Sequence, residues 1–221
     1  MDEIRFDEHG LVACVMQDAS TGEVLTLAYM NAEALQRTRE TGEIHFWSRS
    51  RGVLWRKGET SGNEMHVRAL RVDCDADALL AFVEPAGAAC HTGERTCFHN
   101  GDLTPQPSEA LPALERTIAE RKAAGSGGEA GSGGEAAGSG REAGSGGDAG
   151  SSYTAQLLAD PPRIGDKVRE EAEEVARAAA QEGDERVAEE AADVLYHLTV
   201  LLAARNLVLG DALAVLNARR R

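Results

Sequence analysis

The sequence predicts two domains, an α+β domain over residues 1–107 and an all-α helical bundle over residues 108–221. Short β-rich runs fill the first half of the chain, whereas apolar residues at helical spacing fill the second half. A glycine-rich tract at 125–151 interrupts the helical half. A chain of 221 residues is long enough for two small domains, each with its own core.

The first domain is expected to combine mixed short strands with one helix. Asn31 begins the predicted helix over 31–40, because an asparagine there can cap the free N–H groups of the first turn. Strands interrupted by a single isolated helix do not suggest a βαβ repeat. The strands are expected at 11–17, 23–29, 43–48, 65–73 and 78–84.

The second domain is expected to be helical on both sides of the glycine-rich tract. Near-copies of the unit GSGGEA make up 125–151, which has almost nothing apolar to bury, so we expect a disordered insertion there. A long loop costs little more closure entropy than a shorter one, so the fold can tolerate it. The helices are expected at 108–124, 152–159, 161–181, 184–206 and 211–219.

Charge excludes several classes of partner. The formal net charge is −14, and such a field repels nucleic acid and anionic membranes, so neither is expected as a partner. No apolar run approaches the roughly 20 residues of a membrane helix, and the acidic N-terminus lacks the features of a signal peptide. We therefore expect a cytoplasmic protein. A phosphate-bearing ligand would need a basic patch or a divalent cation.

The cysteines indicate a metal site. Three of the four lie between positions 74 and 97 among aspartates and histidines, which in a cytoplasmic chain favours metal ligation over a disulfide. The fourth, Cys14, lies in the apolar run LVACVM and is expected to be a buried core thiol. Thiolates suit Zn²⁺, so the candidate zinc ligands are Cys74, Cys90 and Cys97.

Alternating carboxylates surround the first of these cysteines. In an extended segment, the aspartates of DCDAD share one face while Cys74 points to the other. Three carboxylates suit Mg²⁺, so the candidate magnesium ligands are Asp73, Asp75 and Asp77.

Two kinds of zinc site are consistent with this spacing. Three protein ligands leave an open position that binds and acidifies a water, and His91 is then a candidate acid or base. The alternative is a closed structural site, with His91 or His99 as the fourth ligand and the aspartates in a solvated turn.

A basic and aromatic segment supplies candidate substrate contacts. Guanidinium groups and hydroxyls suit a phosphate, and an indole ring can stack on a purine. The alternative is a strand with a solvated basic face. The candidate residues are Trp47, Ser48, Arg49, Arg51, Trp55, Lys57, Ser61 and Asn63.

Acidic residues recur on two predicted helices of the second domain. On a helical wheel they flank or join the apolar stripes, and burying several carboxylates is unfavourable unless cations compensate. A divalent metal explains them, whereas the alternative is a charged helix surface with arginines at i,i+4 spacing. The candidate magnesium ligands are Glu170, Glu171, Glu174, Glu190 and Asp193.

The motifs of the first half resemble those of phosphoribosyl-AMP cyclohydrolase: LAYMNAEAL, HFWSRSRGVLWRKGETSGN, VDCDADALL and CHTGERTCF, in family order. The resemblance implies a zinc hydrolase that opens the adenine ring of phosphoribosyl-AMP between N1 and C6. It also implies a homodimer in which Cys74 of one protomer meets the other two cysteines of its partner, with Mg²⁺ on the three aspartates and proton transfer assisted by His91.

The motifs of the second half resemble phosphoribosyl-ATP pyrophosphatase, within the all-helical nucleotide pyrophosphohydrolases: LERTIAERK, SYTAQLLA, KVREEAEEV and EAADVLYHLTVLL. The resemblance implies Mg²⁺-dependent cleavage of phosphoribosyl-ATP between the α and β phosphates, with Glu171 as a catalytic residue. Lys167 either contacts phosphate or is an ordinary surface lysine. Because the resemblance begins before the glycine-rich tract and resumes after it, the tract interrupts the second domain.

Together these resemblances imply a bifunctional hydrolase of histidine biosynthesis. Two alternatives remain open on the sequence. One is a house-cleaning nucleotide pyrophosphohydrolase with a purine-binding zinc module, and the other is a non-catalytic, zinc-stabilised dimerisation protein.

Overall fold

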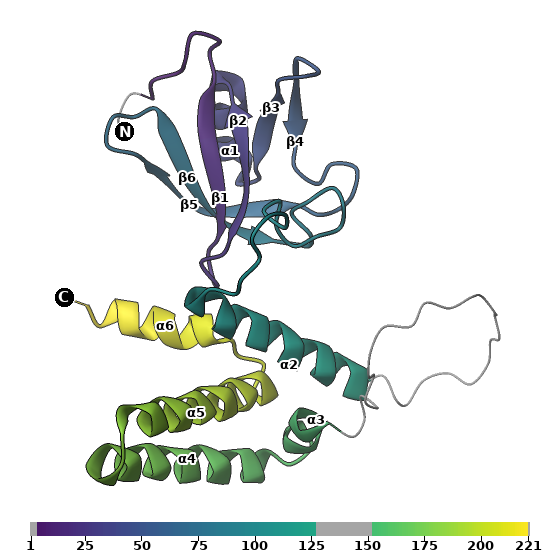
Figure 1. Ribbon diagram of the computed structural model, residues 1–221. Helices are drawn as coiled ribbons and strands as arrows, with labels where there is room; N and C mark the ends of the chain where they lie inside the picture. The colour runs from purple at the N-terminus through teal and green to yellow at the C-terminus, as the bar shows by residue number, and fades with distance from the viewer. Residues whose placement is uncertain (1–3, 127–151, 221) are drawn as a thin grey trace, which may run out of the picture. The chain divides into compact units, whose positions relative to one another are not determined.

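The computed structural model describes residues 4–126 and 152–220, and the chain divides into two compact units, Met1–Pro105 and Gln106–Arg221. Figure 1 shows that the first unit contains the sheet and the second contains helices, as the sequence predicted. The insertion expected at 125–151 lies outside the described residues, except for its first two, which end a helix.

A four-stranded mixed sheet forms the centre of the first unit. Its two inner strands run parallel, and each edge strand pairs antiparallel with its inner neighbour. Every second side chain of the first strand is buried, as expected for a strand with one face on the core. In spatial order the strands are β2 (Val24–Met30), β1 (Val12–Asp18), β6 (Ala78–Pro85) and β5 (Met65–Val72).

A helix and a hairpin complete this unit. The helix α1 (Ala32–Thr41) begins as predicted at Asn31, whose side chain accepts a hydrogen bond from the Ala34 amide at 2.8 Å, and it ends at Gly42 in the left-handed conformation. The hairpin pairs β3 (His45–Ser48) with β4 (Val53–Arg56). The sequence did not predict β4, because four residues are too few to show a period without their partner strand.

The core of the first unit lies between the sheet and α1. It includes fully buried side chains from both, such as Met16, Leu25 and Ala34. Cys14 is also fully buried, and burial raises the pKa of its thiol to about 12. The prediction of a core thiol is therefore confirmed.

The second unit is a set of helices around a separate apolar core. α4 and α5 lie side by side and are joined by a short turn at Gly183 (Figure 1). Ile118, Leu157 and Val200 are fully buried between the helices. The elements are a 3-10 turn (Pro107–Glu109), α2 (Ala110–Ser126), α3 (Tyr153–Leu158), α4 (Pro161–Gln181), α5 (Asp184–Ala204) and α6 (Leu209–Ala218).

Helix ends in this unit follow local signals. Asp160 caps α4 by accepting from the Arg163 amide at 3.3 Å, and Pro161 and Pro162 occupy the first turn, where a missing N–H costs nothing.

Among the described residues, no single helix is long and apolar enough to cross a membrane, and α5 and α6 reach that length and composition only as a pair bent by 99°.

Candidate active sites

The loop that follows β6 carries two of the candidate zinc ligands. It folds back on itself through a hydrogen bond from the Cys90 amide to the Glu94 carbonyl at 3.0 Å. Farther along, the Cys97 amide donates to the carbonyl of Leu25 at 2.8 Å, which attaches the loop to the start of β2. The loop thus brings Cys90 and Cys97 to the same end of the sheet.

Cys90 lies in an environment that favours a thiolate. The Thr92 hydroxyl donates to its sulfur at 3.1 Å, and this bond and the Thr92 amide, followed by His99, lower the pKa of Cys90 to about 6. The sulfur also lies 3.8 Å from Nδ1 of His91 and 3.7 Å from Nε2 of His99. A thiolate is the form in which cysteine binds metal.

A pocket of about 450 Å³ opens beside these cysteines. It brings together both cysteines, His91 and half of the predicted substrate contacts. The lining residues are Thr26, Ala28, Phe46, Trp55, Lys57, Gly58, Thr60, Ser61, Asn63, Ala89, Cys90, His91, Gly93 and Cys97.

Lys57 supplies the positive charge of this pocket. It is 7% exposed, and its Nζ donates to the carbonyl of Ala88 at 3.4 Å. Burial lowers the pKa of Lys57, and the nearby cysteines oppose that shift. The adjacent Arg56 is not available to a phosphate in the same way, because it pairs with Glu43 at 2.7 Å and Glu64 at 2.8 Å.

The remaining predicted substrate contacts do not line the pocket. They lie on the β3–β4 hairpin: Arg49 stacks over the ring of Tyr29 at 3.9 Å, and Arg51 donates to the Ser48 hydroxyl at 3.2 Å. The residues outside the pocket are Trp47, Ser48, Arg49 and Arg51.

The segment DCDAD forms a tight turn between β5 and β6. Ala76 has a φ of 66°, a left-handed conformation that lies outside the extended β region. The ligand atoms of Asp73, Cys74 and Asp75 lie within 4.8 Å of one another. The predicted division into a carboxylate face and an opposite thiolate face is therefore wrong, because side chains alternate only along an extended backbone.

The carboxylates of this turn influence one another. The backbone amide of Ala78 donates to Oδ1 of Asp73 at 3.1 Å and lowers the pKa of that carboxyl. The negative charges of Asp75 and Asp73 raise the pKa of Asp77. All three predicted aspartates thus belong to one acidic turn.

The acidic turn of residues 73–77 and the loop that carries Cys90 and Cys97, the cysteine loop, lie at opposite ends of β6. The turn precedes Ala78 and the loop follows Pro85, and the eight-residue strand between them spans about 25 Å. Within the part of the chain that the structure describes, Cys74 therefore groups with its neighbouring aspartates and not with the other two cysteines.

In the second unit, α4 and α5 bring three glutamates together. Carboxylate oxygens of Glu171, Glu174 and Glu190 lie within 4.8 Å of one another, and Glu171 and Glu190 are 5% and 1% exposed. Burial raises the pKa of Glu190, and the charges of Glu174 and Glu171 add to this against the opposing charge of Arg186. Arg186 forms an ion pair with the buried Oε1 of Glu190, which accepts no hydrogen bond of regular geometry.

Two other predicted acids lie outside this group. Glu170 is exposed and pairs with Lys167 at 2.8 Å, and Lys167 also lies 3.0 Å from Glu171. Asp193 is exposed, so the expectation that it projects toward the core is wrong. The contact between α4 and α5 covers a narrower stripe of each helix than a wheel diagram suggests.

The chain resembles known proteins in both halves. Residues 26–99 match the family Phosphoribosyl-AMP cyclohydrolase, and residues 148–220 match Phosphoribosyl-ATP pyrophosphohydrolase. The histidine biosynthesis bifunctional protein HisIE of Bacillus subtilis is 45% identical, covering 99% of this chain and 95% of its own length. HisIE of Gloeobacter violaceus is 46% identical over 98% and 90%, and that of Thermus thermophilus 42% over 100% and 94%.

The chain belongs to the HisIE family. It is a bifunctional enzyme of histidine biosynthesis, with phosphoribosyl-AMP cyclohydrolase activity in its N-terminal part and phosphoribosyl-ATP pyrophosphatase activity in its C-terminal part. Its substrates are phosphoribosyl-ATP and phosphoribosyl-AMP. HisIE membership replaces both alternatives that the sequence left open. The cyclohydrolase family is generally metal-dependent.

Sequence reasoning assigned no role to two residues that lie at the candidate sites. Nδ1 of His197 lies 3.7 Å from Glu171 and 2.9 Å from the carbonyl of Asp193, while Nε2 lies 3.1 Å from the hydroxyl of Tyr153. Arg95 lies inside the cysteine loop and pairs with residues more than 70 positions earlier. On a helical wheel His197 lies on the same side as Glu190, which is a signal that could have found it. No local signal identifies the partners of Arg95.

Proposed function

We propose that the pocket beside the cysteine loop is the cyclohydrolase site and that the glutamate group between α4 and α5 is the pyrophosphatase site. The observation that carries the proposal is that one pocket unites Cys90, Cys97 and His91 with Lys57, while the buried carboxylates lie in the other unit. The domain limits 1–107 and 108–221, and the cytoplasmic location, stay predictions.

In this proposal Zn²⁺ is held by Cys90 and Cys97 together with Cys74 of the partner subunit, so the active protein is a homodimer. The donor set fits zinc, because both cysteines of the loop present soft sulfur atoms and one has a lowered pKa. Bound zinc would acidify a water molecule at neutral pH. The separation of Cys74 from the loop along β6 supports sharing of the zinc ligands between subunits.

The residues of the pocket have distinct proposed tasks. His91 lies next to Cys90 and is exposed at the pocket, so its imidazole can accept a proton and return it. Lys57 binds phosphate as a point charge, and Ser61 and Asn63 donate to oxygen atoms of the substrate. Trp55, whose ring lies 5.5 Å from that of Phe46, stacks on the purine.

His99 defines a second arrangement, because it lies as close to Cys90 as His91 does. In a closed zinc site His99 would be a ligand. If the site is open, His99→Ala should retain ring opening and His91→Ala should lose it. Loss of ring opening in His99→Ala, with retention in His91→Ala, would favour the closed site.

Magnesium is proposed at both acidic groups. Asp73, Asp75 and Asp77 form one oxygen-donor set, and the buried glutamates form the other, with Glu170 and Asp193 nearby on the same helices. Glu171 and Glu190 are buried carboxylates, and a bound cation would offset their negative charge. Bound Mg²⁺ would neutralise the triphosphate. Glu171 then orients the attacking water as the catalytic carboxylate, and Lys167 contacts a phosphate.

Separation of the two activities tests this assignment. With phosphoribosyl-ATP, Mg²⁺ and Zn²⁺, Cys90→Ser should abolish ring opening and retain pyrophosphate release. Glu171→Gln should abolish pyrophosphate release but still open the ring of supplied phosphoribosyl-AMP. Glu173→Gln, an exposed neighbour on the same helix, is the matched control and should retain both activities. Loss of both activities in either site variant would sink the assignment.

A further inference from the structure

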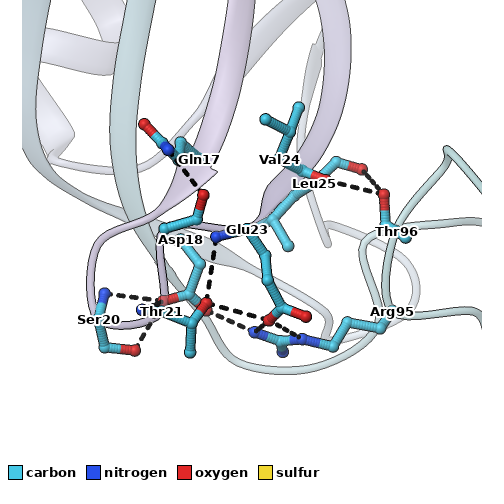
Figure 2. Close-up of polar contacts among 10 residues, drawn as sticks. Gln17, Asp18, Ser20, Thr21, Glu23, Val24, Leu25, Arg95 and Thr96 are labelled. Carbon is cyan, nitrogen blue, oxygen red and sulfur yellow. Dashed lines mark hydrogen bonds and ion pairs between the residues drawn. The ribbon is translucent and has the colours of Figure 1, made fainter. Parts of the chain in front are cut away.

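Arg95 joins the cysteine loop to the hairpin of β1 and β2 (Figure 2). Its NH2 nitrogen donates to Oδ2 of Asp18 at 2.7 Å, and its Nε donates to Oε2 of Glu23 at 2.7 Å. The two carboxylates thus occupy two edges of one guanidinium. A planar fork of this kind holds its partners in direction as well as distance, which a lysine ammonium does not.

The two acceptors are themselves fixed by the turn between the strands. Asp18 is 4% exposed, and it also accepts hydrogen bonds from the Ser20 amide at 2.8 Å and the Ser20 hydroxyl at 2.7 Å. The Thr21 hydroxyl donates to Glu23 at 3.0 Å. Figure 2 shows these groups converging on the guanidinium from the turn. Arg95 is therefore attached to a rigid part of the sheet.

The residues after Arg95 extend this attachment to the second cysteine. The Thr96 hydroxyl donates to the carbonyl of Val24 at 2.9 Å, and the Cys97 amide donates to the carbonyl of Leu25 at 2.8 Å. Three consecutive residues of the loop are thus bound to the hairpin of β1 and β2.

The backbone of Arg95 also reaches the first cysteine. Its carbonyl accepts from the amide of Ala89 at 3.2 Å, and Ala89 immediately precedes Cys90. Arg95 therefore contacts the hairpin through its side chain. Through its backbone it contacts the part of the loop that carries Cys90. It lies two positions before Cys97.

We propose that Arg95 is a positioning residue, which fixes the separation and orientation of Cys90 and Cys97 before metal binds. This inference rests on the proposed zinc site. A loop that must be ordered when the ion arrives binds it more weakly, because ordering side chains and backbone costs conformational entropy. Arg95 and its two carboxylates remove that cost by ordering the loop in the metal-free chain.

The test compares full-length variants in zinc binding. Arg95→Met should weaken Zn²⁺ binding by about 10–100-fold in competition with a chromophoric chelator, a loss typical of removing a group that orients metal ligands. Arg95→Lys keeps the charge but not the fork, and should restore part of the affinity. With Co²⁺ in place of zinc, the thiolate-to-cobalt absorption band should shift or broaden in Arg95→Met.

A measurement without metal tests the geometry directly. In the metal-free protein, hydrogen exchange of the Cys97 amide should be faster in Arg95→Met than in the unmodified chain. Glu23→Gln weakens the contact of Arg95 with residue 23 and leaves Asp18 in place. Its Cys97 exchange rate and zinc affinity should lie between those of the unmodified chain and Arg95→Met, so the test does not depend on Arg95→Met alone being folded. Arg68→Met removes an exposed pair between Arg68 on β5 and Glu84 on β6. It serves as the matched control and should leave the zinc affinity and the cobalt spectrum unchanged.

The possible failures are distinguishable. If the unmodified chain binds no zinc, or if Cys90→Ser binds it equally well, the proposed zinc site is wrong and the role of Arg95 falls with it. If the unmodified chain binds zinc through its cysteines, while Arg95→Met shows the same affinity, cobalt spectrum and Cys97 exchange, only the positioning role is overturned.

Discussion

Cys74 and Cys90 lie at opposite ends of β6, since Cys74 precedes Ala78 and Cys90 follows Pro85. The proposed zinc site, which uses both cysteines, would therefore take them from two copies of the chain. Cys74→Ser and Cys90→Ser should each lack ring opening alone. Mixed with subunit exchange, they should regain up to about a quarter of the normal activity, since random pairing makes half of the dimers mixed and each mixed dimer has one intact site.

Pyrophosphate release in the same samples shows whether the second unit of both cysteine variants is folded. Differently tagged subunits allow the mixed dimers to be isolated. Mixed dimers without any ring opening would contradict a shared zinc site.

If Glu190 is a ligand of Mg²⁺, binding of the ion should slow hydrogen exchange of backbone amides around it. A ligand that binds only the folded state slows opening of the elements that hold it. Mg²⁺ should therefore slow hydrogen exchange in α4 and α5 of the unmodified chain, and it should not do so in Glu190→Gln. The exposed Glu173→Gln should behave like the unmodified chain. An equal response in Glu190→Gln would place the cation elsewhere.

Asp18 should make the first unit sensitive to acid. Burial alone raises the pKa of Asp18, but hydrogen bonds from Ser20, Thr21 and Arg95 outweigh it and hold the pKa below its usual value. A lowered folded-state pKa stabilises the fold above the ordinary carboxyl range near ~4, and this contribution is lost as the pH falls through the folded-state pKa. Asp18→Asn should cost about 1–3 kcal/mol of unfolding free energy at pH 7.

Denaturant unfolding at several pH values measures this contribution. The difference between the unmodified chain and Asp18→Asn should narrow below about pH 4. Glu84→Gln, which removes a carboxylate from an exposed ion pair, should have little effect at any pH. A difference that stays constant from neutral to strongly acidic pH would refute the ionic role of Asp18.

Gly87 should act through Asn63, because a Cβ at Gly87 would overlap the carboxamide oxygen of Asn63. Gly87→Ala should displace that side chain in the pocket and raise KM for phosphoribosyl-AMP by about 3–10-fold, the equivalent of one lost hydrogen bond. Asn63→Ala should have the same effect, and the double variant should be no worse than either, since both act on one contact. Additive effects in steady-state kinetics would show that the two residues act separately.

Local patterns determined most of the secondary structure and the composition of both sites. Short β-rich runs predicted the strands of the main sheet, and helical spacing together with caps such as Asn31 predicted the helices. Motifs placed Cys90, Cys97 and Glu171 among metal ligands before any fold was known. These signals are readable because each depends on residues a few positions apart.

Only the tertiary structure decided which of these residues meet. It made DCDAD a turn, removed Asp193 from the buried acids, and paired β4 with β3. It also brought Arg95 to Asp18, 77 positions earlier. Such contacts depend on how strands and helices pack across the chain, and neither side-chain alternation nor helical period encodes a partner at that distance.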